Sequence, residues 1–259
     1  MKRLSFITLA ALLSVGLVAE AGWGSFVSKF RSPGKYAYGV AYRPGQIYIA
    51  CFGGPVLWRT TTTGSVINYY PIKGAIRPHG LTRGTVAGTT YYWLADDYLG
   101  YIYRCVDNSS TVHGSFPAPS KYGRGLAFVD ASHMYHTDYR GSMLYRMHPM
   151  SGSIYGSYAL TFRPYDLAYD PDGYLWIVNL YATTVAEVKM CTTKGSVLAS
   201  FSTKRQGIPY GCGYDAEGSY VWVSVYKKST DLWSVARYDV AGEPAVEPAS
   251  IGKVKALYR

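Results

Sequence analysis

The sequence predicts an all-β fold, a five-bladed β-propeller of four-stranded antiparallel blades. A Pro- and Gly-rich segment recurs five times, as YAYGVAY, RPHGLT, YGRGLAF, RPYDLAY and IPYGCGY. Its equivalent points lie 41, 45, 41 and 45 residues apart, at the marker residues Gly39, Gly80, Gly125, Asp166 and Gly211. An aromatic-led apolar segment follows each copy. The 259-residue chain holds 27 tyrosines, 28 glycines and 13 prolines, a composition typical of strands and turns.

Each repeat divides into four strands. The first follows the marker residue, and a turn such as Arg43-Pro44-Gly45 leads into the second. The second strand carries an aromatic residue, namely Tyr48, Trp93, Tyr135, Trp176 or Trp222. The third strands are expected around residues 57–59, 101–104, 144–147, 185–189 and 235–238. Fourth strands open at Gly64, Gly152 and Gly195 and end six residues later on Tyr70, Tyr158 and Phe201.

The last repeat has three strands but no clear fourth, because the Pro- and Glu-containing segment AGEPAVEPAS follows Val240. Residues 24–30 match residues 195–201 in spacing, in the opening Gly-Ser and in the closing Phe. We therefore expect the N-terminal strand to complete the fifth blade and to leave no open sheet edge.

The chain divides into three regions. Lys2 and Arg3 precede an apolar run over residues 4–19, and Ala19-Glu20-Ala21 has the small-x-small pattern of a cleavage site. Residues 1–21 are therefore predicted to be a secretory signal peptide, since the apolar run is too short to span a bilayer. Residues 22–240 form the propeller, and residues 241–259 form a C-terminal tail. We expect a secreted, periplasmic or cell-surface protein without a transmembrane segment in the mature chain.

Charge is distributed unevenly over the predicted connections. The net charge is +10. Connections from the fourth strand of one blade to the first of the next contain basic residues and no acidic residue: Arg31, Lys35, Lys73, Arg77, Lys121, Arg124, Arg163, Lys204 and Arg205. The turns between first and second strands hold Asp130, Asp170, Asp172, Asp215 and Glu217, against Arg43 and Arg83. A basic face predicts an anionic partner. For an exported protein we expect an anionic glycan or another cell-envelope component rather than nucleic acid.

The residue before each marker is expected at the mouth of the central channel. These residues are Tyr38, His79, Arg124, Tyr165 and Tyr210. Aromatic rims with a few polar groups suit sugar or peptide ligands. With Asp166, Arg77 and Arg163 they make up the predicted ligand-binding set. If the protein were an enzyme, His79 oriented by Asp166 would be the candidate general base.

A second ring of residues lies three positions after each second-strand aromatic. Its oxygen-bearing members, Asp96, Asp138 and Asn179, could hold Ca²⁺ or Mg²⁺. The other interpretation is that they cap turns by bonding to backbone amides. His136 occupies an apolar second-strand position and is interpreted as a buried, hydrogen-bonded core residue.

Four cysteines allow a disulfide in an exported protein. Cys51 in the first repeat and Cys212 in the fifth would be neighbours in a closed ring, so they are the candidate pair. Buried free thiols are the favoured state, because cysteine also serves as a small core residue.

Two stretches, RPYDLAYDPDGYLWIVN and YYWLADDYLGYIY, resemble the blades of the NHL, YVTN and streptogramin-lyase-like propellers. This resemblance implies the propeller fold, and it is compatible with several functions. The favoured hypothesis is a binding or scaffold module for an anionic glycan. One alternative is a metal-dependent lyase or lactonase, and another is a structural surface protein that mediates protein contacts.

Overall fold

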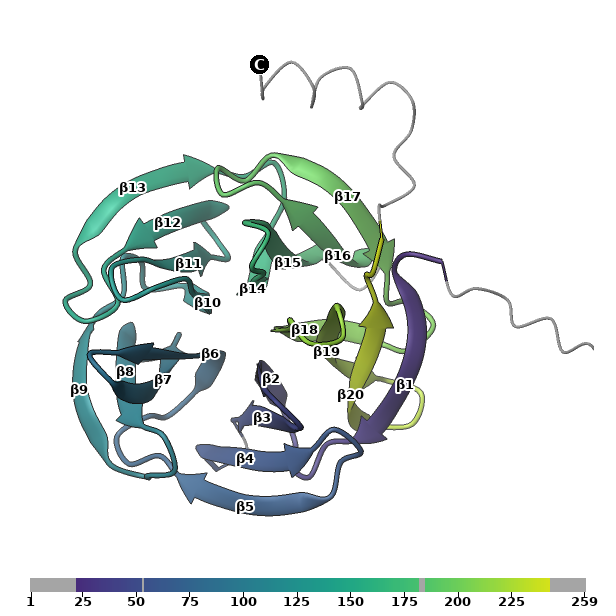
Figure 1. The fold of residues 1–259 in the computed structure, drawn as a ribbon, viewed down its shortest axis with the longest axis horizontal. Coiled ribbons are helices and arrows are strands. Elements are labelled where there is room, and N and C mark those ends of the chain that lie inside the picture. Colours follow the sequence, from purple (N-terminus) through teal and green to yellow (C-terminus); the bar gives the residue numbers. More distant parts are fainter. Residues whose placement is uncertain (1–21, 53, 182–184, 243–259) are drawn as a thin grey trace, which may run out of the picture.

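The computed structural model describes residues 22–52, 54–181 and 185–242. They form five four-stranded antiparallel sheets arranged in a ring around a central channel (Figure 1). This arrangement confirms the predicted five-bladed propeller. No helix in the described part of the chain is long and apolar enough to cross a membrane. The predicted signal peptide and nearly all of the predicted tail lie outside the described residues.

In blades one to four the strands run outward from the channel in chain order (Figure 1). Blade one comprises β2 (Ala37–Arg43), β3 (Gln46–Cys51), β4 (Val56–Thr61) and β5 (Val66–Pro71). Blade two comprises β6 (Pro78–Val86), β7 (Thr89–Asp96), β8 (Tyr101–Val106) and β9 (Val112–Pro117). Blade three comprises β10 (Gly123–Phe128), β11 (Met134–Asp138), β12 (Met143–Met147) and β13 (Ile154–Ala159). Blade four comprises β14 (Pro164–Tyr169), β15 (Leu175–Tyr181), β16 (Val185–Cys191) and β17 (Val197–Ser202).

Blade five joins the two ends of the chain. It comprises β18 (Ile208–Asp215), β19 (Tyr220–Lys227), β20 (Leu232–Asp239) and the N-terminal β1 (Ser25–Arg31). β1 pairs antiparallel with β20, from Ser25 opposite Asp239 to Arg31 opposite Ser234 (Figure 1). The predicted closure is confirmed.

The recurring glycines are required by the close approach of neighbouring blades. A Cβ atom on Gly80 would lie 1.9 Å from the carbonyl oxygen of Arg124 in the next blade. A Cβ atom on Gly211 would lie 2.2 Å from the carbonyl oxygen of Tyr38, across the joint between blades five and one. Such backbone contacts leave no room for a side chain. At the fourth marker, the Asp166 carboxylate instead accepts a hydrogen bond from the Cys212 amide of blade five (2.9 Å).

Large aromatic side chains fill the space between blades. Tyr48, Trp93 and Trp222 from the second strands are at most 1% exposed. Burying such a side chain contributes about 2–3 kcal/mol. The four cysteines are buried free thiols, as favoured from the sequence, and Cys51 and Cys212 lie in separate apolar clusters. Burial raises the pKa of the Cys51 thiol to about 12.

Candidate functional site

The five residues that precede the markers meet at one end of the channel, as predicted. The Tyr38 ring stacks on the His79 ring, with 4.2 Å between centroids. Tyr210 lies 5.3 Å from Tyr38 and 5.2 Å from Tyr165. The Arg124 guanidinium lies 4.2 Å from the centre of the Tyr165 ring. Since His79 and Tyr165 are only 4% and 6% exposed, these side chains fill the mouth as a packed layer.

A carboxylate that the sequence analysis did not single out organises this layer. Asp97 follows β7 directly, and its side chain is 2% exposed. It accepts hydrogen bonds from Nε of Arg77 (2.5 Å) and from Nε of Arg124 (3.0 Å). Its Oδ2 also lies 3.2 Å from Nε2 of His79. One buried carboxylate therefore holds both arginines and the histidine of the mouth.

The alignment of the five repeats contains a signal for Asp97. The equivalent positions of the other blades, one residue after the second ring, hold apolar or aromatic side chains: Phe52, Tyr139, Leu180 and Tyr226. Asp97 is the acidic exception in that column.

The charges at the mouth leave one positive charge in excess. Burial alone would raise the pKa of Asp97, but hydrogen bonds from His79 and Arg77 and the nearby positive charges hold it well below its ordinary value. Burial lowers the pKa of His79 to about 4, although Asp97 opposes this shift. At neutral pH the cluster therefore contains one carboxylate, two guanidiniums and a neutral imidazole.

The arginines are also held by aromatic rings. The Arg124 guanidinium contacts both Tyr139 and Tyr165, 4.3 and 4.2 Å from the ring centres. The Arg77 guanidinium lies 6.0 Å from Phe52 and from Tyr98. Both arginines donate to Asp97 through Nε, so these two hydrogen bonds do not use their terminal nitrogens.

Arg163, the remaining arginine of the predicted set, lies beside this group. Its guanidinium is 5.9 Å from the Tyr139 ring, which Arg124 also contacts. The structure therefore brings Arg77, Arg124 and Arg163 to the same rim, from blades two, three and four.

The expected pairing of His79 with Asp166 is wrong. His79 pairs with Asp97 of its own blade, whereas Asp166 reaches from blade four toward blade five. Asp166 is 1% exposed, and burial raises its pKa well above the ordinary value. The other nitrogen of His79, Nδ1, is buried without a hydrogen-bond partner in the described structure. A histidine in this state is poorly placed to reach a substrate.

Two of the three residues predicted as metal ligands, Asp96 and Asp138, hold turns, whereas Asn179 bonds to a side chain on the neighbouring strand. Asp96 accepts four backbone amides, two on each carboxylate oxygen. Asp138 accepts the amides of Arg140 and Gly141. The Asn179 amide donates to Glu187 (2.7 Å). Within residues 22–242, apart from the four undescribed positions, no group of three or more His, Cys, Asp or Glu side chains could hold a metal ion. For Asp96 and Asp138 the geometry favours the turn-capping interpretation over a metal centre.

His136 is a core residue, as interpreted from the sequence. It is fully buried, and its Nδ1 lies 2.8 Å from the Gly125 carbonyl oxygen. Burial lowers its pKa to about 4. It therefore belongs to the packing of blade three.

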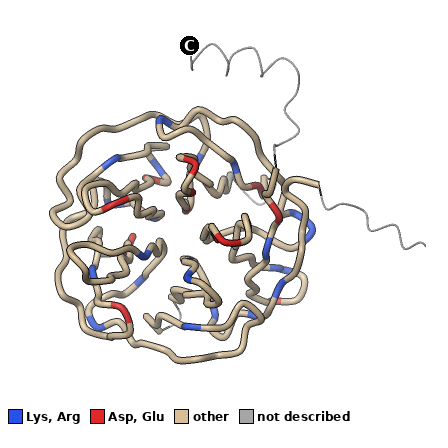
Figure 2. The backbone as a smooth tube through the Cα atoms, viewed as in Figure 1, with Lys and Arg blue, Asp and Glu red and all other residues tan. Residues whose placement is uncertain are grey.

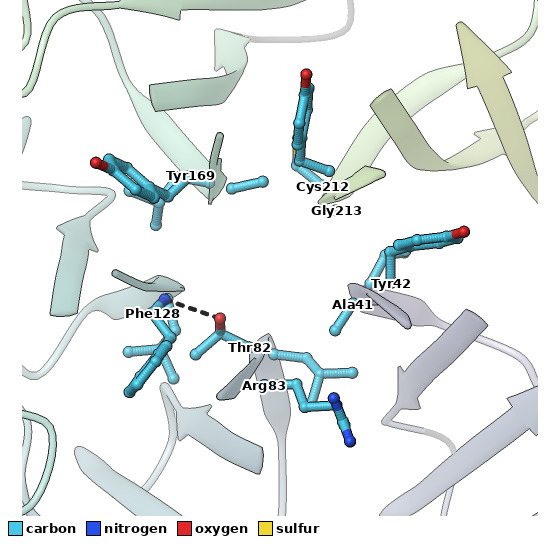
Figure 3. Close-up of a pocket in the computed structure, with 14 residues that line it drawn as sticks. Ala41, Tyr42, Thr82, Arg83, Phe128, Tyr169, Cys212 and Gly213 are labelled. Atoms are coloured by element: carbon cyan, nitrogen blue, oxygen red, sulfur yellow. Dashed lines mark hydrogen bonds between the residues drawn. The ribbon is translucent and has the colours of Figure 1, made fainter. Parts of the chain in front are cut away.

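The opposite end of the channel holds acidic turns and a small cavity. Acidic residues lie in the turns after β14 and β18 (Figure 2). The cavity of about 90 Å³ is lined by the innermost strands, and there Thr82 Oγ1 accepts a hydrogen bond from the Phe128 amide (Figure 3). The rings of Tyr42, Phe128 and Tyr169 point away from the channel axis (Figure 3). A cavity of this size and lining suits a few water molecules.

Comparisons with known proteins place the chain by its fold. No family model and no curated protein matches the sequence. The structure is similar to glutaminyl cyclase from Myxococcus xanthus, with a TM-score of 0.60, 11% identity, and coverage of 84% of this chain and 97% of that one. It is also similar to regucalcin, a calcium-binding protein from Agrobacterium tumefaciens, with a TM-score of 0.54, 12% identity, and coverage of 86% and 98%.

Virginiamycin B lyase from Staphylococcus aureus reaches a TM-score of 0.47 at 14% identity, over 83% of this chain and 89% of that one. Identities this low relate folds and not activities. The chain is thus a β-propeller, as its blade-level resemblance implied.

Proposed function

We propose that the protein is a binding module that holds an anionic glycan at the channel mouth. One observation carries this proposal: Arg77 and Arg124 are both fixed by the single buried carboxylate of Asp97. The pair retains one positive charge beyond what Asp97 neutralises. Fixed guanidiniums favour carboxylate, sulfate or phosphate groups, because the planar fork donates two parallel hydrogen bonds.

The preorganisation of the arginines supports a binding role. Free arginine side chains lose rotamer freedom when they hold a ligand, which costs about 0.5–1.5 kcal/mol each. Here the bonds to Asp97 and the contacts of Arg124 with two tyrosine rings have already restricted that freedom. An incoming anion therefore meets donors that are oriented before it arrives.

The aromatic surroundings favour a glycan over a small inorganic anion. Tyr38 and Tyr210, which are partly exposed, offer aromatic surface and hydroxyl groups near the arginines, and such mixed surfaces suit sugars. Burial raises the pKa of Tyr38 to about 12, so its hydroxyl keeps its proton at neutral pH. The predicted export of the chain is compatible with a glycan partner outside the cell.

Isothermal titration calorimetry tests this proposal with tetragalacturonate, a heparin tetrasaccharide and neutral maltotetraose. We expect at least one acidic probe to bind at least tenfold more tightly than maltotetraose, and to weaken as salt is added. Arg77→Gln with Arg124→Gln should reduce that affinity at least tenfold.

The matched control is Lys204→Gln with Arg205→Gln, which removes the same charge from exposed residues in another connection on this face. It should leave the affinity within about twofold, since the effect of exposed charges is small. Equal losses in both double variants would contradict a specific site, and equal binding of acidic and neutral probes would contradict the proposed function.

A further inference from the structure

A second hollow opens beside the mouth, between blades five and one. Its volume is about 210 Å³. We call it the aromatic box, and it is lined by Tyr36, Tyr38, Tyr210, Tyr226 and Trp233, with Lys35 and Asp231. Among these residues Trp233 contacts three of the tyrosines, with its ring centroid 4.9 Å from that of Tyr210, 5.0 Å from Tyr226 and 5.4 Å from Tyr38.

One wall of the box is held in a disfavoured backbone conformation. Tyr36 has a φ of 54°, in the left-handed region that bulky residues avoid. Its carbonyl accepts the Phe52 amide at 3.1 Å. Tyr122, three residues before the marker of blade three as Tyr36 is in blade one, accepts the Tyr139 amide in the same way without a positive φ. That hydrogen bond therefore does not require the left-handed conformation.

The conformation does set the position of the Tyr36 ring. The ring lies 5.9 Å from Trp233 and 6.3 Å from Tyr38, while the residue remains 43% exposed. Strained residues of this kind concentrate at ligand sites, where the surrounding structure holds them in place. Tyr36 is thus positioned as an outer wall of the box.

The lining selects the chemistry of the occupant. Ring faces suit an apolar surface, whereas Asp231, Lys35 and the tyrosine hydroxyls suit a polar edge. The Asp231 carboxylate accepts a hydrogen bond from the Tyr226 hydroxyl (3.0 Å) and retains a further oxygen for a ligand. The charges of Lys35 and Asp231 cancel, so the lining of the box favours an uncharged ligand.

A cation would also meet an unfavourable field. The charges of Arg124 and Arg77 reach the box, since both act to lower the pKa of Tyr38, against the larger effect of burial. A neutral ring with an apolar face and a hydroxyl-bearing edge matches the lining best. The volume lies below the roughly 300–1,000 Å³ of pockets for larger ligands, which favours a single ring.

We propose that the aromatic box binds one pyranose ring of the glycan whose acidic group contacts Arg77 and Arg124. This inference rests on the proposed function and names its second contact. Tyr38 connects the two places, because it lines the box and stacks on His79, which in turn pairs with Asp97. A glycan that extends from the arginines over Tyr38 reaches Trp233.

The test compares an acidic sugar with an anion that has no rings, using calorimetry. Tyr36→Gly removes the wall and suits the left-handed backbone. We expect it to weaken tetragalacturonate binding at least tenfold and to leave linear polyphosphate binding within about twofold. Tyr122→Gly is the matched control at the equivalent position of blade three, and it should alter neither affinity.

A second variant guards against an effect on folding. Asp231→Gly also suits its φ of 51° and removes the carboxylate from the box. It should weaken tetragalacturonate binding several-fold and leave polyphosphate binding unchanged. If tetragalacturonate binds but neither variant weakens it, the box inference is wrong and the proposed function stands. If Tyr36→Gly weakens both probes equally, the box is also wrong. If neither anion binds the unaltered protein, the proposed function fails first.

Discussion

Replacing Asp97 with Asn should destabilise the propeller more than the loss of any other single charge at the channel mouth. The side chain is 2% exposed and receives hydrogen bonds from Arg77 and Arg124, with His79 at 3.2 Å. The substitution leaves two guanidiniums facing a neutral group, and the Asn amino group cannot accept their hydrogens.

The magnitude follows from how deeply the partners are buried. Removing one member of a buried ion pair costs about 3–5 kcal/mol. The side chains of Arg77 and Arg124 are 36% and 15% exposed, so water compensates part of the loss. We therefore expect the free energy of unfolding to fall by about 3 kcal/mol, at the lower end of that range. For a domain of this size this corresponds to a Tm lower by about 6–12 °C.

Urea denaturation at pH 7, followed by tryptophan fluorescence, measures this difference. The matched control is Asp130→Asn on the opposite face, whose side chain is 55% exposed and pairs with His133 at 3.0 Å. That variant should lose no more than about 1 kcal/mol. If Asp97→Asn is also within about 1 kcal/mol of the unaltered protein, the proposed role of Asp97 as the organiser of the mouth is refuted.

Further predictions concern titration and backbone packing. Asp166→Asn should raise the free energy of unfolding at pH 7 by about 1 kcal/mol or more. The pKa of Asp166 is raised by burial, so above the ordinary aspartate range the unfolded chain ionises this group more readily than the folded protein, and the folded protein loses stability. Equal or lower stability of the variant in urea denaturation would contradict this. The pKa values of His79 and His136 are lowered from 6.5 to about 4, so the unfolded chain binds two more protons in that window. In the Asp166→Asn variant, where the opposing titration of Asp166 is absent, stability should therefore fall as pH decreases from 6.5 to 4, by up to about 2.7 kcal/mol per pH unit; a flat profile for this variant by denaturation at several pH values would show that the two histidines are not buried neutral. Gly80→Ala should lower the free energy of unfolding by about 3 kcal/mol or more, because the new Cβ would meet a backbone oxygen at 1.9 Å. Gly45 has open space around it, so Gly45→Ala should lose only the ~1–2 kcal/mol that its positive φ costs. Similar losses for both variants would argue against the close approach of the blades.

The fold could be predicted because its determinants are periodic. Gly39, Gly80, Gly125 and Gly211 recur where neighbouring backbones nearly touch, so the spacing of the glycines records the spacing of the blades. The position of the mouth residues is predictable for the same reason, since residues at one offset from the marker occupy equivalent positions in each blade. The match of residues 24–30 with residues 195–201 likewise identified the strand that closes the ring.

The partners of the mouth residues could not be predicted from that periodicity. The pairing of Asp97 with Arg124 joins a turn of blade two to the start of blade three, and it depends on side-chain direction as well as position. The expected pairing of His79 with Asp166 failed because blade three lies between their blades and Asp166 points toward blade five. Tyr38 and Tyr210 of the aromatic box belong to the predicted ligand-binding set, but its outer wall had no signal in the sequence, because the left-handed conformation of Tyr36 runs against the preference of its residue type.

The most direct test of the central proposal is a crystal structure of the protein with tetragalacturonate at a concentration that saturates binding in solution. We expect a ligand carboxylate within hydrogen-bond distance of terminal nitrogens of Arg77 or Arg124, and a sugar ring against Trp233. Tetragalacturonate bound on another face of the propeller, with the mouth empty, would contradict the proposal.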